Sequence, residues 1–155
     1  MATRKYSPAT GALGAESVLG TAGTDASIAY NSLSGKYLVG WSAAASALSS
    51  GRILNSCSVS DSSGTFTLNS AGRTISVAYN SKNNTYASIV QNQNDSGNTY
   101  NILDASGVKL ASGTAFTGGN GNFSPVIGAN LTDGSFAAIS SKDYITTRFA
   151  PNIKR

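Results

Sequence analysis

The sequence has few of the residues on which enzymes and metal proteins depend. Its 155 residues include no histidine, one cysteine and seven acidic residues, and Glu16 is the only glutamate. General acid–base catalysis, covalent catalysis and transition-metal binding rely mainly on His, Cys and paired carboxylates. The aspartates stand mostly beside Gly or Ser in turn-like segments, where a carboxylate usually caps its own turn. We therefore predict a protein without catalytic residues, cofactor or metal ion.

Cysteine, charge and long apolar runs are scarce as well. The single cysteine, Cys57, excludes an intrachain disulfide, and its strand-like surroundings predict a small buried side chain. Only 12% of the residues are charged. No apolar run approaches the length of a membrane-spanning helix, and no signal peptide is visible near the N-terminus. We expect a protein of a virion or of the extracellular space that does not insert into membranes.

The net charge is +4, and basic residues are concentrated near both ends of the chain. Because the two ends take equivalent positions in the repeat described below, they are predicted to form one basic patch. Such a patch would contact an acidic protein surface, and nucleic acid is not the expected partner. Protection of edge strands by Lys and Arg is the simpler explanation. The candidate contacts are Arg4, Lys5, Arg148, Lys154 and Arg155.

What the chain does contain is an internal repeat. Segment 27–41 returns as 76–90 and, more weakly, as 126–140. A repeat with a period of roughly 50 residues indicates one supersecondary unit copied along the chain. The pair Tyr30-Asn31 of the first copy becomes Tyr79-Asn80 in the second and Ala129-Asn130 in the third.

Each copy is predicted to be a β-hairpin. Apolar residues alternate with small ones along the strands, which is the period-two pattern of a β-strand. Gly35, Asn84 and Gly134 take matching places in the connections, and Gly and Asn tolerate the positive φ of tight turns. Because both strand faces are apolar or small, we expect both to be covered. The repeated tyrosines Tyr30, Tyr37, Tyr79 and Tyr86, together with Trp41, are then core residues rather than ligand-stacking residues.

Two further strand series complete a repeat of four short strands. One consists of Lys5-Tyr6, Ile53-Leu54, Ile102-Leu103 and Arg148-Phe149, and the other of Val18-Leu19, 65–68 and Ala115-Phe116. We therefore predict one all-β domain over residues 1–155. Its repeats cover about 3–50, 51–98 and 99–146, with a partial strand at 147–155.

The motif apolar-Ala-Tyr-Asn-Ser, followed by a turn and Tyr-Leu-Val-x-Trp, resembles the repeats of bacterial and phage β-propellers. The resemblance spans nearly the whole chain, although the third copy has Ala129 in place of the tyrosine and no tryptophan. It implies four-stranded blades, with one chain end completing the blade of the other end. Propellers need at least about four blades, so we expect a half-propeller that is completed by oligomerisation, most simply as a six-bladed homodimer. The alternative is a β-trefoil, which has three repeats of four strands and closes as a monomer.

Two polar segments, 91–98 and 118–122, are the candidate ligand loops, because amide-rich loops can bind hydroxyl groups. Ordinary solvent-exposed turns are the simpler explanation. The candidate contacts are Asn92, Asn94 and Asn120. We predict a non-enzymatic structural protein, such as a decoration or tail-associated subunit of a phage virion, that binds copies of itself and other virion proteins. The alternative is a lectin-like module that binds glycans through several equivalent weak sites.

Overall fold

The computed structural model describes residues 2–4, 6–19, 23–43, 48–55, 64–93, 97–117, 124–140 and 146–149. All the regular elements in these ranges are β-strands, which confirms the predicted all-β class. The same ranges include no helix that is long and apolar enough to cross a membrane. Cys57 lies outside the described residues.

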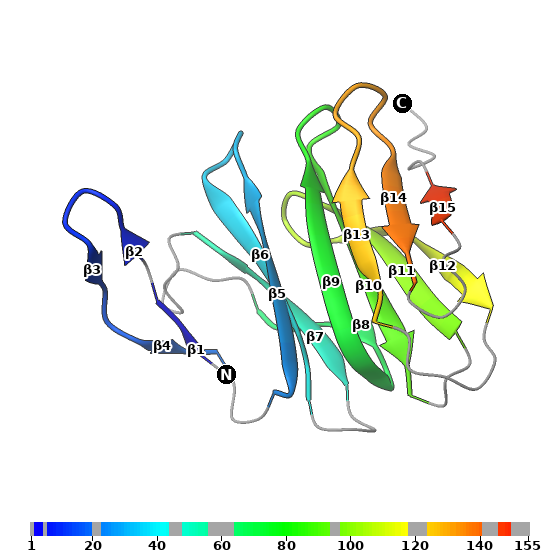
Figure 1. The fold of residues 1–155 in the computed structure, drawn as a ribbon, viewed down its shortest axis with the longest axis horizontal. Helices are drawn as coiled ribbons and strands as arrows, with labels where there is room; N and C mark the ends of the chain where they lie inside the picture. Colours follow the sequence, from blue (N-terminus) through cyan, green and yellow to red (C-terminus); the bar gives the residue numbers. More distant parts are fainter. Residues whose placement is uncertain are drawn as a thin grey trace.

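Three antiparallel sheets follow one another along the chain, and we call them blades 1, 2 and 3 (Figure 1). Blade 1 contains β5 (Asp25–Asn31), β6 (Lys36–Ser42), β7 (Ser49–Leu54) and β8 (Phe66–Asn69). Blade 2 contains β9 (Gly72–Asn80), β10 (Thr85–Asn92), β11 (Gly97–Asp104) and β12 (Lys109–Thr117). Blade 3 contains β13 (Val126–Ala129), β14 (Phe136–Ile139) and β15 (Thr146–Phe149). Each strand pairs with the next one in sequence, so every blade is a meander.

Four short strands precede blade 1 and form a bent hairpin, which we call the N-terminal hairpin. Its strands are β1 (Ala2–Thr3), β2 (Tyr6–Ser7), β3 (Ala12–Leu13) and β4 (Ser17–Val18). Strand β1 pairs with β4, and β2 pairs with β3. This hairpin lies beside blade 1, at the opposite end of the row from blade 3 (Figure 1).

The blades have the predicted strands but not the predicted phase. Each blade begins with the Tyr-Asn-Ser hairpin or its equivalent, whereas the predicted boundaries near residues 50 and 98 fall inside β7 and β11. Blades 1 and 2 have the four strands expected of a repeat, and blade 3 has three among the described residues. A repeated sequence gives the length of the repeat but not the residue at which each repeat begins. That residue is set by where the first strand of each sheet starts.

The hairpin turns follow the predicted chemistry. Gly35, Asn84 and Gly134 adopt φ angles of 71°, 54° and 79°, which L-residues with larger side chains rarely adopt. The side-chain oxygen of Asn31 accepts hydrogen bonds from the backbone N–H groups of Leu33 and Ser34 at 2.9 and 3.0 Å. These local bonds turn the chain immediately after β5 and set the register of the hairpin.

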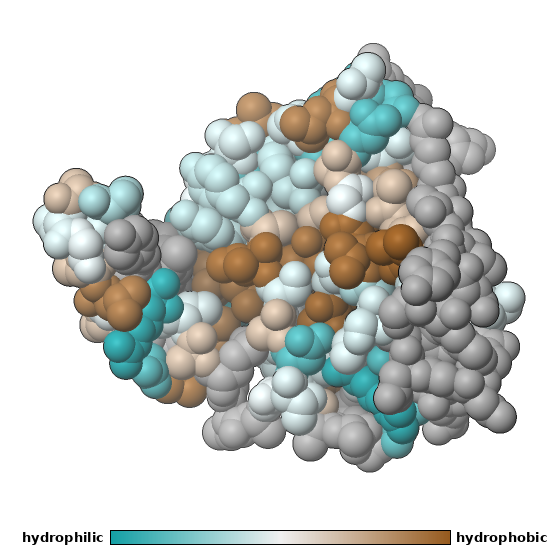
Figure 2. All heavy atoms as spheres, in the orientation of Figure 1, coloured by the Kyte–Doolittle hydropathy of each residue, from teal (hydrophilic) through white to brown (hydrophobic). Residues whose placement is uncertain are grey.

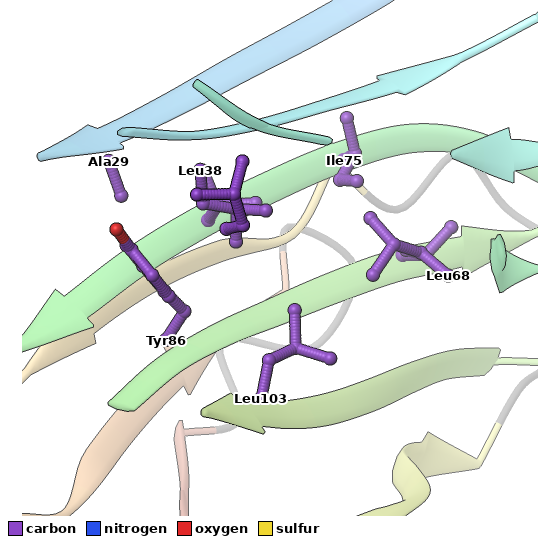
Figure 3. Close-up of a cluster of buried hydrophobic side chains, with 9 residues drawn as sticks. Ala29, Leu38, Leu68, Ile75, Tyr86 and Leu103 are labelled. Atoms are coloured by element: carbon purple, nitrogen blue, oxygen red, sulfur yellow. The ribbon is translucent and has the colours of Figure 1, made fainter. Parts of the chain in front are cut away.

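The blades stack face to face. Between blades 1 and 2, Ala29 and Leu38 point toward Tyr86 and Leu103 (Figure 3). A second cluster, which includes Ile89 and other apolar side chains, fills the interface between blades 2 and 3. Such burial is the main favourable contribution to folding.

Backbone hydrogen bonds to serine side chains join the first strands of neighbouring blades. The Ser27 hydroxyl oxygen accepts the N–H of Val77 at 3.1 Å, and the equivalent Ser76 accepts the N–H of Ile127 at 3.2 Å. Strands β5, β9 and β13 therefore lie side by side (Figure 1). Because each repeat forms its own sheet and the sheets stack, the fold is that of propeller blades. The β-trefoil alternative is wrong.

The prediction that the repeated aromatic residues are core holds for some of them. Tyr86 is fully buried and Trp41 is 6% exposed, while Tyr37 and Tyr79 are half-buried. Tyr30 is 51% exposed, so the prediction is wrong at this position. The reason is that Tyr79 faces blade 1, whereas the equivalent face of blade 1 has no complete blade against it.

Candidate assembly surfaces

Of the predicted basic contacts, the structure describes the side chain of Arg4 alone. Its guanidinium donates to the Glu16 carboxylate at 2.8 Å, and both side chains are about half exposed. An exposed ion pair of this kind contributes about 1 kcal/mol or less. Arg148 is placed in β15 without a described side chain, and Lys5, Lys154 and Arg155 lie outside the described residues.

Among the described residues, the predicted basic positions Arg4 and Arg148 do not lie together. The N-terminal hairpin, which carries Arg4, and β15, which carries Arg148, lie at opposite ends of the row of blades (Figure 1). The two ends hold equivalent positions in the repeat. Residues at equivalent positions lie in different blades, so they need not be close in space.

Asn92 is the one predicted ligand contact that the structure describes. Its side-chain oxygen accepts hydrogen bonds from the Asn69 amide at 2.8 Å and from the Thr99 hydroxyl at 2.9 Å. Asn92 therefore holds the turn between β8 and β9 against blade 2. Asn94 and Asn120 lie outside the described residues.

Three ionisable groups among the described residues have perturbed pKa values, and burial raises the pKa of the first, Tyr79. Burial raises the pKa of Tyr86 to about 12, and the neighbouring Asn31 side chain offsets only part of this effect. Burial also acts to raise the pKa of Asp104, but hydrogen bonds from Ser106 and Val108 outweigh it and lower that pKa. Asp104 thus caps its own turn, as predicted for the aspartates. Within the described ranges, no three His, Cys, Asp or Glu side chains come together at a potential metal site.

One face of blade 1 is open, and we call it the front face. It carries Ile28 and Tyr30, which are 53% and 51% exposed. In blade 2, blade 1 covers the equivalent face, and Val77 at the position of Ile28 is 7% exposed. The N-terminal hairpin covers the front face only in part. A cavity of about 170 Å³ remains there, lined by Ala2, Thr3, Ala26, Ser27, Ile28 and Val39.

The face of blade 3 that points away from blade 2 is also open, and we call it the rear face. It carries Val126 and Ile139, which are 57% and 43% exposed. In blade 2, Ile89 stands at the position of Ile139 and is fully buried by blade 3. The side of the molecule seen in Figure 2 also shows a band of apolar residues that crosses β5, β9 and β13, the first strands of the three blades.

The sequence alone pointed to neither face, although it contained a usable signal. Ile28 and Ile139 are apolar at strand positions whose equivalents are interface residues in blade 2. Only knowledge of the blade order shows that these two positions have no complete blade against them.

No protein-family model and no curated protein matches the sequence. Solved structures resemble its fold, among them two variants of an exo-β-1,3-galactanase from Phanerochaete chrysosporium with β-1,3-galactotriose. The first has a TM-score of 0.51 and 16% identity over 75% of this chain, and the second has 0.49 and 17% over 74%. The present chain spans only 28% of the length of either enzyme chain. The matched part of the first is a β-propeller, so the likeness supports the propeller-like fold of this chain.

Proposed function

We propose that this protein is a non-enzymatic assembly protein, such as a decoration or tail-associated subunit of a virion. It would act by packing its blade faces against other copies of itself and against neighbouring virion proteins. The observation that carries the proposal is the pair of open apolar faces, the front face of blade 1 and the rear face of blade 3.

The exposed apolar side chains on these two faces support the proposal because of their positions in the repeat. Single exposed apolar residues are ordinary on a protein surface. Ile28 and Ile139, however, hold repeat positions that are buried wherever a neighbouring blade is present, as Val77 and Ile89 show. At these positions both faces resemble the internal interfaces, and burying them would gain hydrophobic free energy of the same kind.

The virion assignment is supported by the resemblance of the repeat to phage propellers and by the low charge. The experiment is sedimentation of the purified protein over a wide concentration range, followed by co-sedimentation with particles from the producing host culture. We expect an oligomer that stays with the particles through a density gradient. A protein that remains monomeric and separates completely from the particles would refute the proposal.

A lectin-like module is the second candidate. It is favoured by the likeness of the fold to an enzyme whose structure contains β-1,3-galactotriose. A glycan array that includes β-1,3-galactans tests it directly. We expect no binding, whereas saturable binding that is lost in Asn94→Ala or Asn120→Ala, and retained in Ser34→Ala, would favour the lectin.

A further inference from the structure

The residue that follows the N-terminal hairpin occupies a position that recurs in the blades. Leu68 at the end of blade 1 packs against the face of blade 2, and Phe116 at the end of blade 2 packs against blade 3. Leu19 packs in the same way against Val39 and Trp41 of blade 1 and is 5% exposed. Leu19 therefore stands where the last strand of a preceding blade would place its interface residue.

The N-terminal hairpin thus corresponds to the outer part of a blade, and no described strand occupies the place of that blade's first two strands on the front face of blade 1. Blade 3 has the complementary composition, because its described strands are the first, second and third of a blade. Blade 3 therefore carries the first two strands that would complete a blade on the front face.

We propose that a second copy of this chain occupies these faces head to tail, with the rear face of its blade 3 packed on the front face of blade 1. This inference rests on the proposed function, because it specifies the partner in the proposed self-association. The seated blade 3 lies beside the N-terminal hairpin of the copy that receives it.

The internal interface between blades 1 and 2 predicts which residues meet. A Cβ atom added at Gly40 would lie 2.7 Å from Cδ1 of Ile75 and 3.2 Å from Cγ1 of Val77. Ile139 is the equivalent of Gly40, while Ala26 and Ile28 are the equivalents of Ile75 and Val77. The head-to-tail contact therefore places Ile139 of one copy over Ala26 and Ile28 of the other.

Head-to-tail contacts use two different surfaces, so they generate either closed rings or open filaments. Two copies contribute six blades, which lies within the range of about four to eight that closes a propeller. Among the described residues, the front face and the rear face lie at opposite ends of the row of blades and do not meet (Figure 1). A ring of two copies also brings the N-terminal hairpin of each chain to blade 3 of the other, next to β15.

The contact between copies lacks polar bonds that the internal interfaces have. The Asn31 amide donates to Asn84 in the next blade at 2.9 Å, whereas the equivalent Asn130 amide donates to Asp133 in its own turn at 3.1 Å. Val126, at the position of Ser27, has no hydroxyl group. The contact is therefore mainly apolar, and we expect dimerisation to be reversible and concentration-dependent.

Disulfide trapping tests the predicted contact in the full chain, with Cys57→Ser as the background. Proteins carrying Ile28→Cys alone and Ile139→Cys alone are mixed, oxidised and separated without reductant. Because these side chains are both about half exposed, each variant is expected to fold. We expect at least ten times more covalent dimer in the mixture than in either protein alone or in a mixture of Ile28→Cys with Leu131→Cys. Leu131 is 59% exposed and lies in a turn, which makes it the matched control.

A second measurement uses the oligomer without any cross-link. Ile139→Lys should weaken dimerisation at least tenfold in sedimentation equilibrium, while Leu131→Lys should leave it unchanged. An oligomeric wild type whose mixture gives no trapped dimer, or whose single variants trap as well as the mixture, would overturn the head-to-tail contact and leave self-association standing. A wild type that is monomeric at all concentrations would instead refute the proposed self-association itself.

Discussion

Alanine substitution of the repeated asparagine at the end of the first strand should have very different costs in the three blades. Asn31, Asn80 and Asn130 are equivalent in sequence, and each side-chain oxygen accepts a backbone N–H in its own turn. Asn31 and Asn80 are fully buried, however, and Asn130 is exposed. The series therefore separates the turn bond, which all three share, from the bonds between blades, which two of them make.

The hydrogen bonds of Asn80 set the expected magnitude. Its amide donates to the carbonyl oxygens of Asn130 and Ser135 in blade 3, both at 3.1 Å, and its oxygen accepts the N–H of Lys82. At about 1 kcal/mol for each bond, with a further penalty for the buried Ser135 carbonyl, Asn80→Ala should cost about 3–4 kcal/mol. Asn31→Ala loses one bond between blades and should cost about 2–3 kcal/mol. Water can replace the bonds of Asn130, so Asn130→Ala should cost about 1 kcal/mol or less.

Urea unfolding of the three variants, followed by far-UV circular dichroism and by Trp41 fluorescence at one protein concentration, gives the free energies of unfolding. Losses of this size are a large fraction of the 5–15 kcal/mol that is typical of a domain. Equal losses in all three variants would show that the shared turn bond dominates, and would refute the role given to the bonds between blades.

Two further predictions concern packing and pH. Gly72→Ala should lower the free energy of unfolding in urea by about 1–3 kcal/mol, because the added Cβ would lie 2.0 Å from the Ser49 hydroxyl. Gly128 has no atom within 4 Å of an added Cβ, so Gly128→Ala should stay within about 0.5 kcal/mol of wild type. Equal costs for the two glycines would contradict the close approach at position 72. Burial raises the pKa of Tyr86 to about 12, so the fold favours the neutral phenol, and stability that is present below pH 10 should fall by about 2–3 kcal/mol as the pH rises through the interval from 10 to 12. Tyr86→Phe should remove this loss of stability at alkaline pH. If the unfolding free energy of Tyr86→Phe fell between pH 9 and pH 12 by as much as that of wild type, the assignment to Tyr86 would be wrong.

Much of the local structure follows from residues that act within a few positions of one another. Gly35, Asn84 and Gly134 predicted the turns because few other residues adopt a positive φ without strain. Alternating apolar and small residues predicted the strands, and the period predicted repeated sheets. Side-chain contacts were harder to predict: Asn92, a predicted ligand contact, accepts hydrogen bonds from two side chains that only the fold brings to it.

Burial is what the sequence could not assign. Tyr30 and Tyr79 begin identical motifs, yet Tyr30 is exposed because no complete blade covers it, while Tyr79 is packed against blade 1. Asn80 and Asn130 differ in the same way. The repeating strand-and-turn unit follows from the sequence, because turn chemistry and side-chain alternation act locally. Which copies of a residue form core and which form open faces follows from the packing of the blades, because burial depends on a neighbouring blade that is distant in the chain.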